Sequence, residues 1–336
     1  MKNKILITGA SGFIGSYLVE EALAQGFEVY AGIRKSSSKQ FLQDERIHFV
    51  ELDFSSEVKL EQQLSSLKQL HGNFDYVVHN AGVTQAKKKE DFFIVNCGYT
   101  QNLVHALKAS GIVLQKFVLI SSLAAYGPGN AESFVPVELQ HKPQPVSVYG
   151  KSKLCAQEFI QSSSIFPYII INPTAVYGPR DKDFLQFVKL INKRIEPYIG
   201  TNKQMVSLIY VKDLTRAVIS LLNTSFVNRS YIVSDGVDYN KEQLGDAVKS
   251  ILLKKTFKIK IPALPIRMTI AAVEKTQQLI WGTLPFLNLE KVNEISSPNW
   301  LCNSAALWND LASAPNYLLE NGMKETVSWY KENNWL

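Results

Sequence analysis

KILITGASGFIG at residues 4–15 is the stretch from which the fold of this chain can be read. Its apolar start has no helical period and predicts a strand, whereas the apolar residues from Ile14 to Leu23 recur at helical spacing. Gly9 and Gly12 let the backbone turn sharply between the two, and Gly15 lets the helix lie close to the strand. Because such a helix N-terminus offers free N–H groups and a partial positive charge, the turn predicts a site for the pyrophosphate of a dinucleotide.

A second stretch, YGKSK at residues 149–153, opens an expected amphipathic helix. Tyr149 and Lys153 stand at i and i+4 and therefore share one helix face, about a turn apart. A free phenol has a pKa near ~10, and an adjacent ammonium group lowers this pKa because it favours the phenolate. Such a pair can serve as a general acid and base. Alone it is also typical of a solvated helix face, but the glycine turn favours the catalytic interpretation.

Further motifs follow in an order and spacing that one known family shares. They are Leu52-Asp53, Asn80-Ala81-Gly82, Asn96 within residues 95–100, Ser122 within residues 120–127, and residues 175–180. With these motifs the chain resembles, over nearly its whole length, the extended short-chain dehydrogenase/reductase family, also called the NAD-dependent epimerase/dehydratase family. The resemblance implies that Ser122 polarises the substrate oxygen and that Tyr149 is the general acid/base. It also implies that Lys153 lowers the pKa of Tyr149 and holds the nicotinamide ribose.

The resemblance places the other functional residues at these motifs, with Asp53 expected to contact the adenine. The expected cofactor-binding residues are Gly9, Ser11, Gly12, Phe13, Ile14, Gly15, Arg34, Asp53, Phe54, Asn80, Ala81, Gly82, Asn96, Lys153, Pro173 and Val176. The expected substrate-contacting residues are Thr84, Ser122, Tyr177 and Arg180.

Position 34 bears on the choice of cofactor. An NAD enzyme normally carries Asp or Glu about 20 residues past the glycines, where the carboxylate accepts a hydrogen bond from the ribose 2′-hydroxyl and repels a 2′-phosphate. This chain instead has Arg34, followed by Lys35 and three serines. A guanidinium can bind the phosphate and stack on the adenine. We therefore expect NADP(H), with NAD(H) as the alternative if Arg34 is merely solvated.

Departures from the family pattern bear on the reaction. The family's dehydratases carry an Asp-Glu pair directly after the active-site Ser or Thr, where this chain has Leu123 and Ala124. Its nucleotide-sugar epimerases commonly place Asn and Arg-Asp where this chain has Ala175 and Val206-Ser207. The pattern is therefore most similar to the dihydroflavonol reductase and 3β-hydroxysteroid dehydrogenase branch, whose substrates are apolar ketones or alcohols.

These departures lead to one expected function and two alternatives. We expect an NADP(H)-dependent reductase or dehydrogenase for the ketone, aldehyde or secondary alcohol of a small, largely apolar substrate. The first alternative is a nucleotide-sugar 4-epimerase that retains its cofactor, with Arg180 as a phosphate contact. The second is a cofactor-sensing protein without catalysis.

Short apolar runs alternate with helical stretches through the first half of the chain. The runs are residues 4–8, 28–33, 47–50, 76–79, 116–121 and 168–172. This alternation predicts an α/β, Rossmann-type, doubly wound parallel sheet, with ligands beyond the carboxyl ends of the strands. Residues 1–172 and 206–234 are assigned to the NADP(H)-binding Rossmann domain. The resemblance assigns residues 173–205 and 235–336 to a smaller, mainly helical C-terminal substrate domain.

The composition fits an enzyme with a large core: the 336 residues are 46% hydrophobic and 20% charged, with a net charge of +6. The basic residues are spread along the chain, which argues against a nucleic-acid partner. The run at 87–89 is expected to be a solvated loop, or else a gate for an anionic substrate. Three cysteines and five histidines without paired spacing predict neither a disulfide nor a metal site. No signal peptide is recognised, so a cytoplasmic location is expected.

Residues 261–292 form the least polar long segment. Arg267, Glu274 and Lys275 interrupt it, so an integral membrane span is not expected. Three interpretations stay open: a helix that covers the substrate pocket, a homodimer contact, or a helix that lies in a membrane interface.

Overall fold

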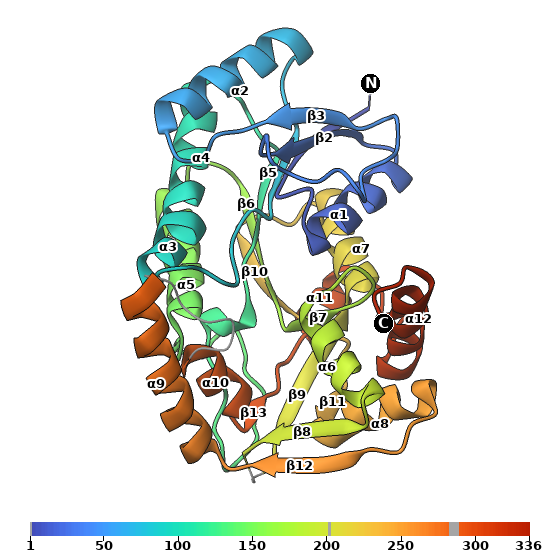
Figure 1. Cartoon of the computed structure of the whole chain (residues 1–336). Coiled ribbons are helices and arrows are strands. Elements are labelled where there is room, and N and C mark those ends of the chain that lie inside the picture. The colour runs from blue at the N-terminus through green and yellow to red at the C-terminus, as the bar shows by residue number, and fades with distance from the viewer. Residues whose placement is uncertain (1, 201–202, 282–288) are drawn as a thin grey trace.

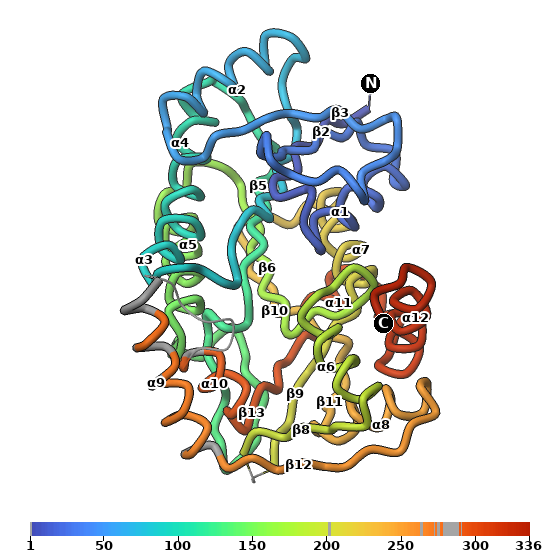
Figure 2. The backbone as a smooth tube through the Cα atoms, in the orientation of Figure 1, coloured from blue at the N-terminus to red at the C-terminus, as the bar shows by residue number. Residues whose placement is uncertain are grey.

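The computed structural model describes residues 2–200, 203–281 and 289–336 (Figures 1 and 2). Its centre is a seven-stranded parallel sheet with the strand order β10-β6-β5-β4-β1-β2-β3. The strands are β1 (Lys4–Thr8), β2 (Glu28–Ile33), β3 (His48–Glu51), β4 (Tyr76–His79), β5 (Lys116–Ile120), β6 (Tyr168–Pro173) and β10 (Arg229–Val233). The strand runs expected from the sequence are confirmed, and the chain order around β1 is that of a doubly wound sheet.

Helices cover both faces of this sheet, as Figure 1 shows. One face carries α1 (Phe13–Ala24), α7 (Val211–Leu222) and α11 (Ala305–Asp310), and the other carries α2 (Glu57–His71), α4 (Tyr99–Ala109) and α5 (Val148–Ser163). Alternation along β1 explains the two cores: Ile5 and Ile7 pack toward α1 and α7, whereas Leu6 packs toward α2 and α4. Strands buried on both faces require the nearly continuous apolar runs seen in the sequence.

Helix α3 (Lys89–Phe93) packs beside α5, and the other elements build a second part below the carboxyl ends of the main sheet. Its helices are α6 (Asp183–Asn192), α8 (Lys241–Leu252), α9 (Ala263–Trp281), α10 (Leu289–Ser296) and α12 (Leu319–Glu332). It also holds two small sheets, one of β7 (Ala175–Tyr177), β9 (Met205–Tyr210), β11 (Asp238–Asn240) and β13 (Asn299–Trp300), the other of β8 (Ile195–Ile199) and β12 (Phe257–Ile261).

The stretch 206–234 is divided between the two parts. Helix α7 packs on the main sheet and strand β10 pairs with β6, whereas β9 pairs with β7, β11 and β13. The domain boundary expected at residue 206 therefore does not follow the strand pairing. An apolar strand has the same sequence pattern whichever sheet it joins, so the pattern could not identify the partners of β9.

Where the structure describes it, the apolar segment 261–292 begins with the last residue of β12 and continues as α9 and the start of α10; Leu284, Phe286 and Leu287 lie outside the described residues. None of the described helices has the length and apolar character that a membrane span requires.

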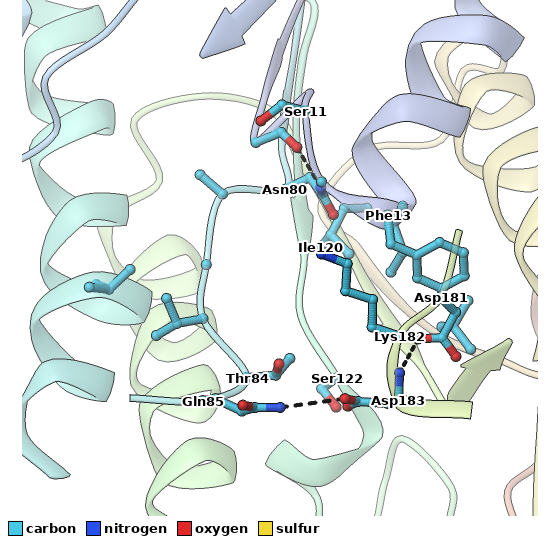
Figure 3. Close-up of a pocket in the computed structure, with 18 of the residues that line it drawn as sticks. Ser11, Phe13, Asn80, Thr84, Gln85, Ile120, Ser122, Asp181, Lys182 and Asp183 are labelled. Atoms are coloured by element: carbon cyan, nitrogen blue, oxygen red, sulfur yellow. Dashed lines mark hydrogen bonds between the residues drawn. The ribbon is translucent and has the colours of Figure 1, made fainter. Parts of the chain in front are cut away.

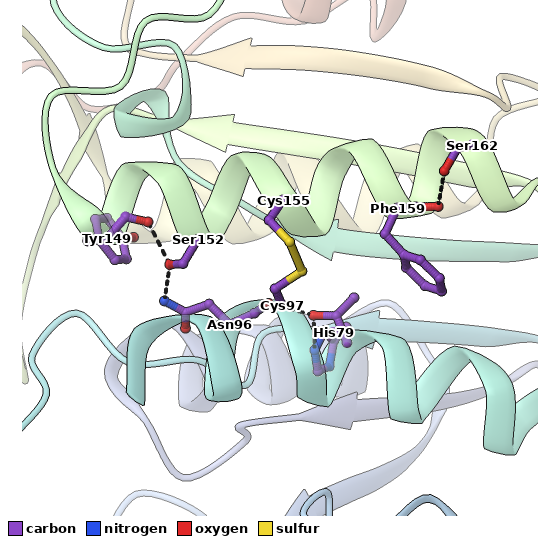
Figure 4. The surroundings of a disulfide bond; sticks show 9 residues. His79, Asn96, Cys97, Tyr149, Ser152, Cys155, Phe159 and Ser162 are labelled. Carbon is purple, nitrogen blue, oxygen red and sulfur yellow. Dashed lines mark hydrogen bonds between the residues drawn. A yellow bond between two sulfur atoms is a disulfide. The ribbon is translucent and has the colours of Figure 1, made fainter. Parts of the chain in front are cut away.

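Cys97 and Cys155 form a disulfide, with their Cα atoms 5.8 Å apart (Figure 4). The sequence analysis predicted no disulfide, and this prediction is wrong. The two cysteines are 58 positions apart and lack a recognisable spacing, so only the packing of α5 against the π-helix Ile94–Gly98 brings them together. In the described part of the chain, no group of three or more His, Cys, Asp or Glu residues is arranged to hold a metal ion.

Candidate active site

A cavity of about 860 Å³ lies at the carboxyl ends of β1, β2, β4, β5 and β6, between the main sheet and the second part (Figure 3). Its volume falls in the usual range for sites that bind small molecules. Most residues expected from the sequence line it. These are Gly9, Ser11, Gly12, Phe13, Ile14, Arg34, Phe54, Asn80, Ala81, Gly82, Thr84, Ser122, Tyr149, Lys153, Pro173, Val176 and Arg180.

The glycine turn has the backbone geometry that a dinucleotide needs. Gly9 has a φ of +65°, and a Cβ atom there would come within 2.8 Å of the Ala81 backbone nitrogen. A Cβ atom at Gly15 would overlap the Gly9 carbonyl oxygen, so Gly15 supports the turn from behind and does not line the cavity. Gly12 caps α1 without a side chain, and no acidic residue stands in its first turn. The turn therefore fits a pyrophosphate.

Arg34 lies exposed directly after β2, at the end of the cavity next to the glycine turn. The Ser37 hydroxyl accepts a hydrogen bond from the Arg34 backbone N–H at 3.0 Å, and Ser37 and Ser38 line the same end. Asp53 does not line the cavity. Its carboxylate accepts hydrogen bonds from the Ser55 side chain and backbone, which lower its pKa, and it lies 3.6 Å from the Lys59 ammonium.

Asn96 does not line the cavity either, but it fixes a loop that does. It is buried in the π-helix, where its Oδ1 accepts a hydrogen bond from the Val83 N–H at 2.8 Å. Its Nδ2 donates to the Val83 carbonyl at 3.1 Å. The same Nδ2 donates to the Ser152 hydroxyl at 2.9 Å, as Figure 4 shows. Asn96 therefore joins the wall formed by Gly82 and Val83 to helix α5.

Ser122 stands at the start of a short 3-10 helix, and Tyr149 and Lys153 stand one turn apart at the start of α5, which brings the three side chains together. Ser122 follows β5 and caps the 3-10 helix Leu123–Ala125, with its Oγ accepting from the Ala124 N–H at 3.1 Å. Tyr149 stands in the first turn of α5, whose N-cap Ser147 accepts from the Gly150 N–H at 3.0 Å. Lys153 follows one turn later, and its ammonium donates to the Ile120 carbonyl at 2.9 Å.

Burial sets the protonation of this group. It raises the pKa of Tyr149 to about 12; a hydrogen bond with Ser122 opposes the rise, and the Glu294 carboxylate adds to it. Burial also lowers the pKa of Lys153 to about 8. The i, i+4 spacing of Tyr149 and Lys153 predicted a lowered pKa for Tyr149, and the structure corrects this: Lys153 donates to the Ile120 carbonyl, and desolvation of the phenolate dominates. Tyr149 therefore holds its proton at neutral pH.

Two expected substrate residues are placed differently from the expectation. Tyr177 is fully buried beneath the cavity and packs against Tyr210 and Phe184, so it does not line the cavity. Arg180 lines the cavity, but its guanidinium faces α1. It stacks on the rings of Tyr17 and Phe41, and it donates to Ser16 at 3.0 Å and to Glu20 at 2.6 Å.

The substrate end of the cavity also has charged residues that the sequence analysis did not identify. These are Asp181, Lys182 and Asp183 before and at the start of α6, and Lys291 and Glu294 on α10. Lys291 lies 3.4 Å from Asp183, and Glu294 accepts a hydrogen bond from the Ser147 hydroxyl. No motif marks these positions, because they reach the cavity only through the packing of the second part.

A glycine-lined cavity at the carboxyl edge of a doubly wound parallel sheet defines a dinucleotide-binding protein of the Rossmann type. The model of the NAD dependent epimerase/dehydratase family matches residues 5–234. The chain belongs to this family of enzymes.

Similar proteins in this family carry out several reactions. A ceramide reductase of Caulobacter vibrioides is 24% identical over 99% of this chain and 96% of its own length. A UDP-glucose 4-epimerase of Vibrio cholerae is 27% identical over 78% of this chain and 80% of its own. A solved UDP-glucuronic acid 4-epimerase from Bacillus cereus, in complex with UDP-glucuronic acid and NAD, has the same fold, with a TM-score of 0.77 and 22% identity over 98% of this chain and 99% of its own.

Proposed function

We propose that this protein is an NADP(H)-dependent reductase or dehydrogenase for the carbonyl or secondary alcohol of a small, largely apolar substrate. The observation that carries the proposal is the convergence of Ser122, Tyr149 and Lys153 on one cavity with the glycine turn. A proton donor beside a dinucleotide cradle is the arrangement that carbonyl reduction requires.

The cofactor would be held by three groups of residues. The N–H groups around Gly9 and Gly12 would bind the pyrophosphate, as the open backbone there allows. Arg34, with Ser37 and Ser38, would bind the 2′-phosphate of NADP(H), since guanidinium and hydroxyl donors suit that group and no carboxylate stands at position 34. Lys153 would hold the ribose next to the nicotinamide. When bound, the nicotinamide supplies the hydride for reduction or accepts it for oxidation.

The protein's own residues would manage the proton and the developing charge. Ser122 would donate a hydrogen bond to the substrate carbonyl oxygen and orient it. Tyr149 would give its hydroxyl proton to that oxygen as the carbonyl carbon is reduced. A pKa of about 12 suits this direction, because the phenol carries its proton at neutral pH and can act as an acid.

Three features of the cavity support an apolar substrate over a nucleotide sugar. Arg180, the expected phosphate contact, is bound by Glu20 and Ser16 on α1. The carboxylates of the substrate end, Asp181, Asp183 and Glu294, outnumber its lysines, Lys182 and Lys291, and Lys291 is paired with Asp183, so the charges there do not favour a diphosphate. Phe92, Val95 and Phe184 supply apolar wall on the same side. The relative named ceramide reductase, which aligns over almost the whole chain, is by its name a reductase that acts on a lipid, and this supports the proposal.

The test is turnover with both cofactors and a panel of aryl, steroid and long-chain ketones, aldehydes and UDP-sugars, followed by absorbance of the reduced cofactor and by chromatography of products. We expect consumption of NADPH with an apolar ketone. Tyr149→Phe should lower this turnover by about 10²–10⁴-fold while cofactor binding persists. Interconversion of UDP-sugars without net cofactor consumption would establish the epimerase instead. Cofactor binding without turnover of any substrate would favour a sensing protein.

A further inference from the structure

The two-stranded sheet of β8 and β12 has an apolar face that lies open. Its parallel register pairs Phe257 with Ile195, Ile259 with Pro197, and Ile261 with Ile199, so these six side chains share one face. The opposite face holds buried Glu196 and Tyr198 and packs toward α8 through the ion pair of Glu196 with Lys249. On the open face Phe257 is 76% exposed and Ile259 is 45% exposed.

Large apolar side chains continue on both sides of β12. Leu253, which precedes the strand, is 91% exposed, and Met268, one turn into α9, is 68% exposed. A folded protein normally avoids exposing so many large apolar groups within one short stretch of chain, and such a concentration marks an interaction site.

Basic residues gather at one end of this apolar face. Lys193 and Arg194 come directly before β8, and Lys254 and Lys255 come shortly before β12. The parallel pairing brings the two strand starts together, and the Phe257 N–H donates to the Arg194 carbonyl at 2.9 Å. The segment 253–273 has five Lys and Arg residues and no Asp or Glu, but Lys258 and Lys260 belong to the opposite face, where Lys258 lies 3.5 Å from Glu242. The one carboxylate of β8, Glu196, is buried on the opposite face.

We propose that residues 193–195, 253–257, 259 and 267–268, the β8–β12 surface, dock the protein on an anionic lipid bilayer. Lys and Arg attract anionic headgroups, while exposed Phe, Leu, Ile and Met side chains enter the boundary between headgroups and acyl chains. A nucleic acid would bind the cations but would leave the apolar side chains exposed to water. A second copy would place two clusters of like charge near one another.

The position of this surface connects it to the cavity. Strand β12 leads directly into α9, and α10 contacts both α9 and β8 (Figures 1 and 2). Lys291 and Glu294 of α10 line the substrate end of the cavity. A bilayer against the β8–β12 surface would therefore lie beside the element that forms one cavity wall. The inference does not rest on the proposed reaction, because binding to vesicles is measured without turnover.

Co-sedimentation with vesicles tests the proposal. We expect the wild-type protein to bind vesicles of phosphatidylcholine with phosphatidylglycerol and to bind phosphatidylcholine vesicles far less, with the binding weakened by salt. Lys254→Glu/Lys255→Glu should weaken binding by at least about tenfold, since each cation near the surface contributes about 1 kcal/mol. Phe257→Ser should weaken it too, including at high salt, because it removes apolar insertion.

The matched control is Lys108→Glu/Lys142→Glu, which makes the same change in net charge at exposed positions on α4 and in the 142 loop. It should bind nearly as the wild-type protein does, and circular dichroism should show all variants folded. Equal losses in both double variants would mean that only net charge matters and would overturn the surface. Absence of wild-type binding to anionic vesicles would also overturn the proposal. So would a Phe257→Ser variant that still binds vesicles but has lost a dimerisation or a DNA binding that the wild-type protein shows.

Discussion

Arg34 is the residue on which the proposed preference for NADP(H) rests. It is exposed, follows β2 directly, and lines the same end of the cavity as Ser37 and Ser38. A carboxylate at this place would accept from a ribose hydroxyl and repel a phosphate, whereas a guanidinium does the opposite. Among the described residues, no Asp or Glu forms an ion pair with Arg34, so no neighbouring carboxylate neutralises its guanidinium charge.

Arg34→Asp should weaken NADPH binding by about 2–3 kcal/mol, because it replaces a charge-assisted hydrogen bond with repulsion. NADH binding should change much less. Calorimetric titration of both cofactors into wild-type protein and variant measures this. Lys142→Asp makes the same charge change at an exposed loop position and should leave both affinities nearly unchanged. Wild-type protein that binds NADH as tightly as NADPH would contradict the prediction.

The site residues that the sequence could predict are those held by local geometry. Gly9 and Gly15 were recognisable because a side chain at either would collide with neighbouring backbone, and this holds wherever the turn occurs. Glu294 was not recognisable from the sequence. It lies almost 150 positions after its hydrogen-bond partner Ser147, and it reaches the cavity only because α10 packs there. The pKa of Tyr149 was predicted in the wrong direction for a related reason: the spacing to Lys153 was visible, but the burial was not.

At the scale of elements, the contact between α5 and the π-helix Ile94–Gly98 holds the site together. Asn96 joins the Val83 loop to Ser152, and Ser152 in turn donates to the Tyr149 carbonyl at 2.7 Å. The Cys97–Cys155 disulfide crosses the same contact (Figure 4). Periodicity predicted α5 and the strands of the main sheet, because their apolar patterns are local. It could not predict this cross-link or the pairing of β9, since both depend on partners distant in sequence.

Removing the disulfide should destabilise the protein by about 2–4 kcal/mol. The disulfide closes a loop of 58 residues and so lowers the chain entropy of the unfolded state. This raises the free energy of unfolding by about 4 kcal/mol before effects on the native state are counted. Urea unfolding of Cys155→Ser measures the loss, and a dithiol reductant should lower wild-type stability similarly but leave Cys155→Ser unchanged. Cys302→Ser, at the free buried cysteine, should still respond to the reductant. Three titratable thiols in the denatured, unreduced protein would contradict the prediction.

At the scale of the whole molecule, three buried groups in different places make stability depend on pH between about 5 and about 6.5. Burial raises the pKa of Asp181 and of Asp235 to about 6, although backbone hydrogen bonds oppose both shifts. Burial lowers the pKa of His79, the last residue of β4, whose ring lies between the Thr8 and Thr100 hydroxyls, to about 3. Asp44 and Glu196 have lowered pKa values and so exchange protons mainly below this range.

The signs of these contributions differ. A carboxyl whose pKa is raised on folding contributes stability that is present below its unfolded pKa and is lost as pH rises through about 6. His79 contributes stability that is present above its unfolded pKa of about 6.5 and is lost as pH falls. Between about pH 5 and about pH 6 the folded state therefore takes up protons on two carboxyls, while the unfolded state takes up a proton on one imidazole.

We accordingly expect the free energy of unfolding to fall, not rise, as pH increases from about 5 to about 6.5, with a slope of at most about 1.4 kcal/mol per pH unit. Asp235→Asn should flatten the slope, because its Oδ1 can still accept from the Val237 N–H while its amide group stands where Oδ2 accepts from Tyr239 and can donate to the Tyr239 hydroxyl oxygen instead. Asp181→Asn/Asp235→Asn should reverse its sign, because only the His79 contribution is left. Urea unfolding at several pH values measures all three proteins. A wild-type stability that increases with pH across this range, or a double variant with the wild-type slope, would show that these carboxyls do not take up protons in the folded state as burial requires.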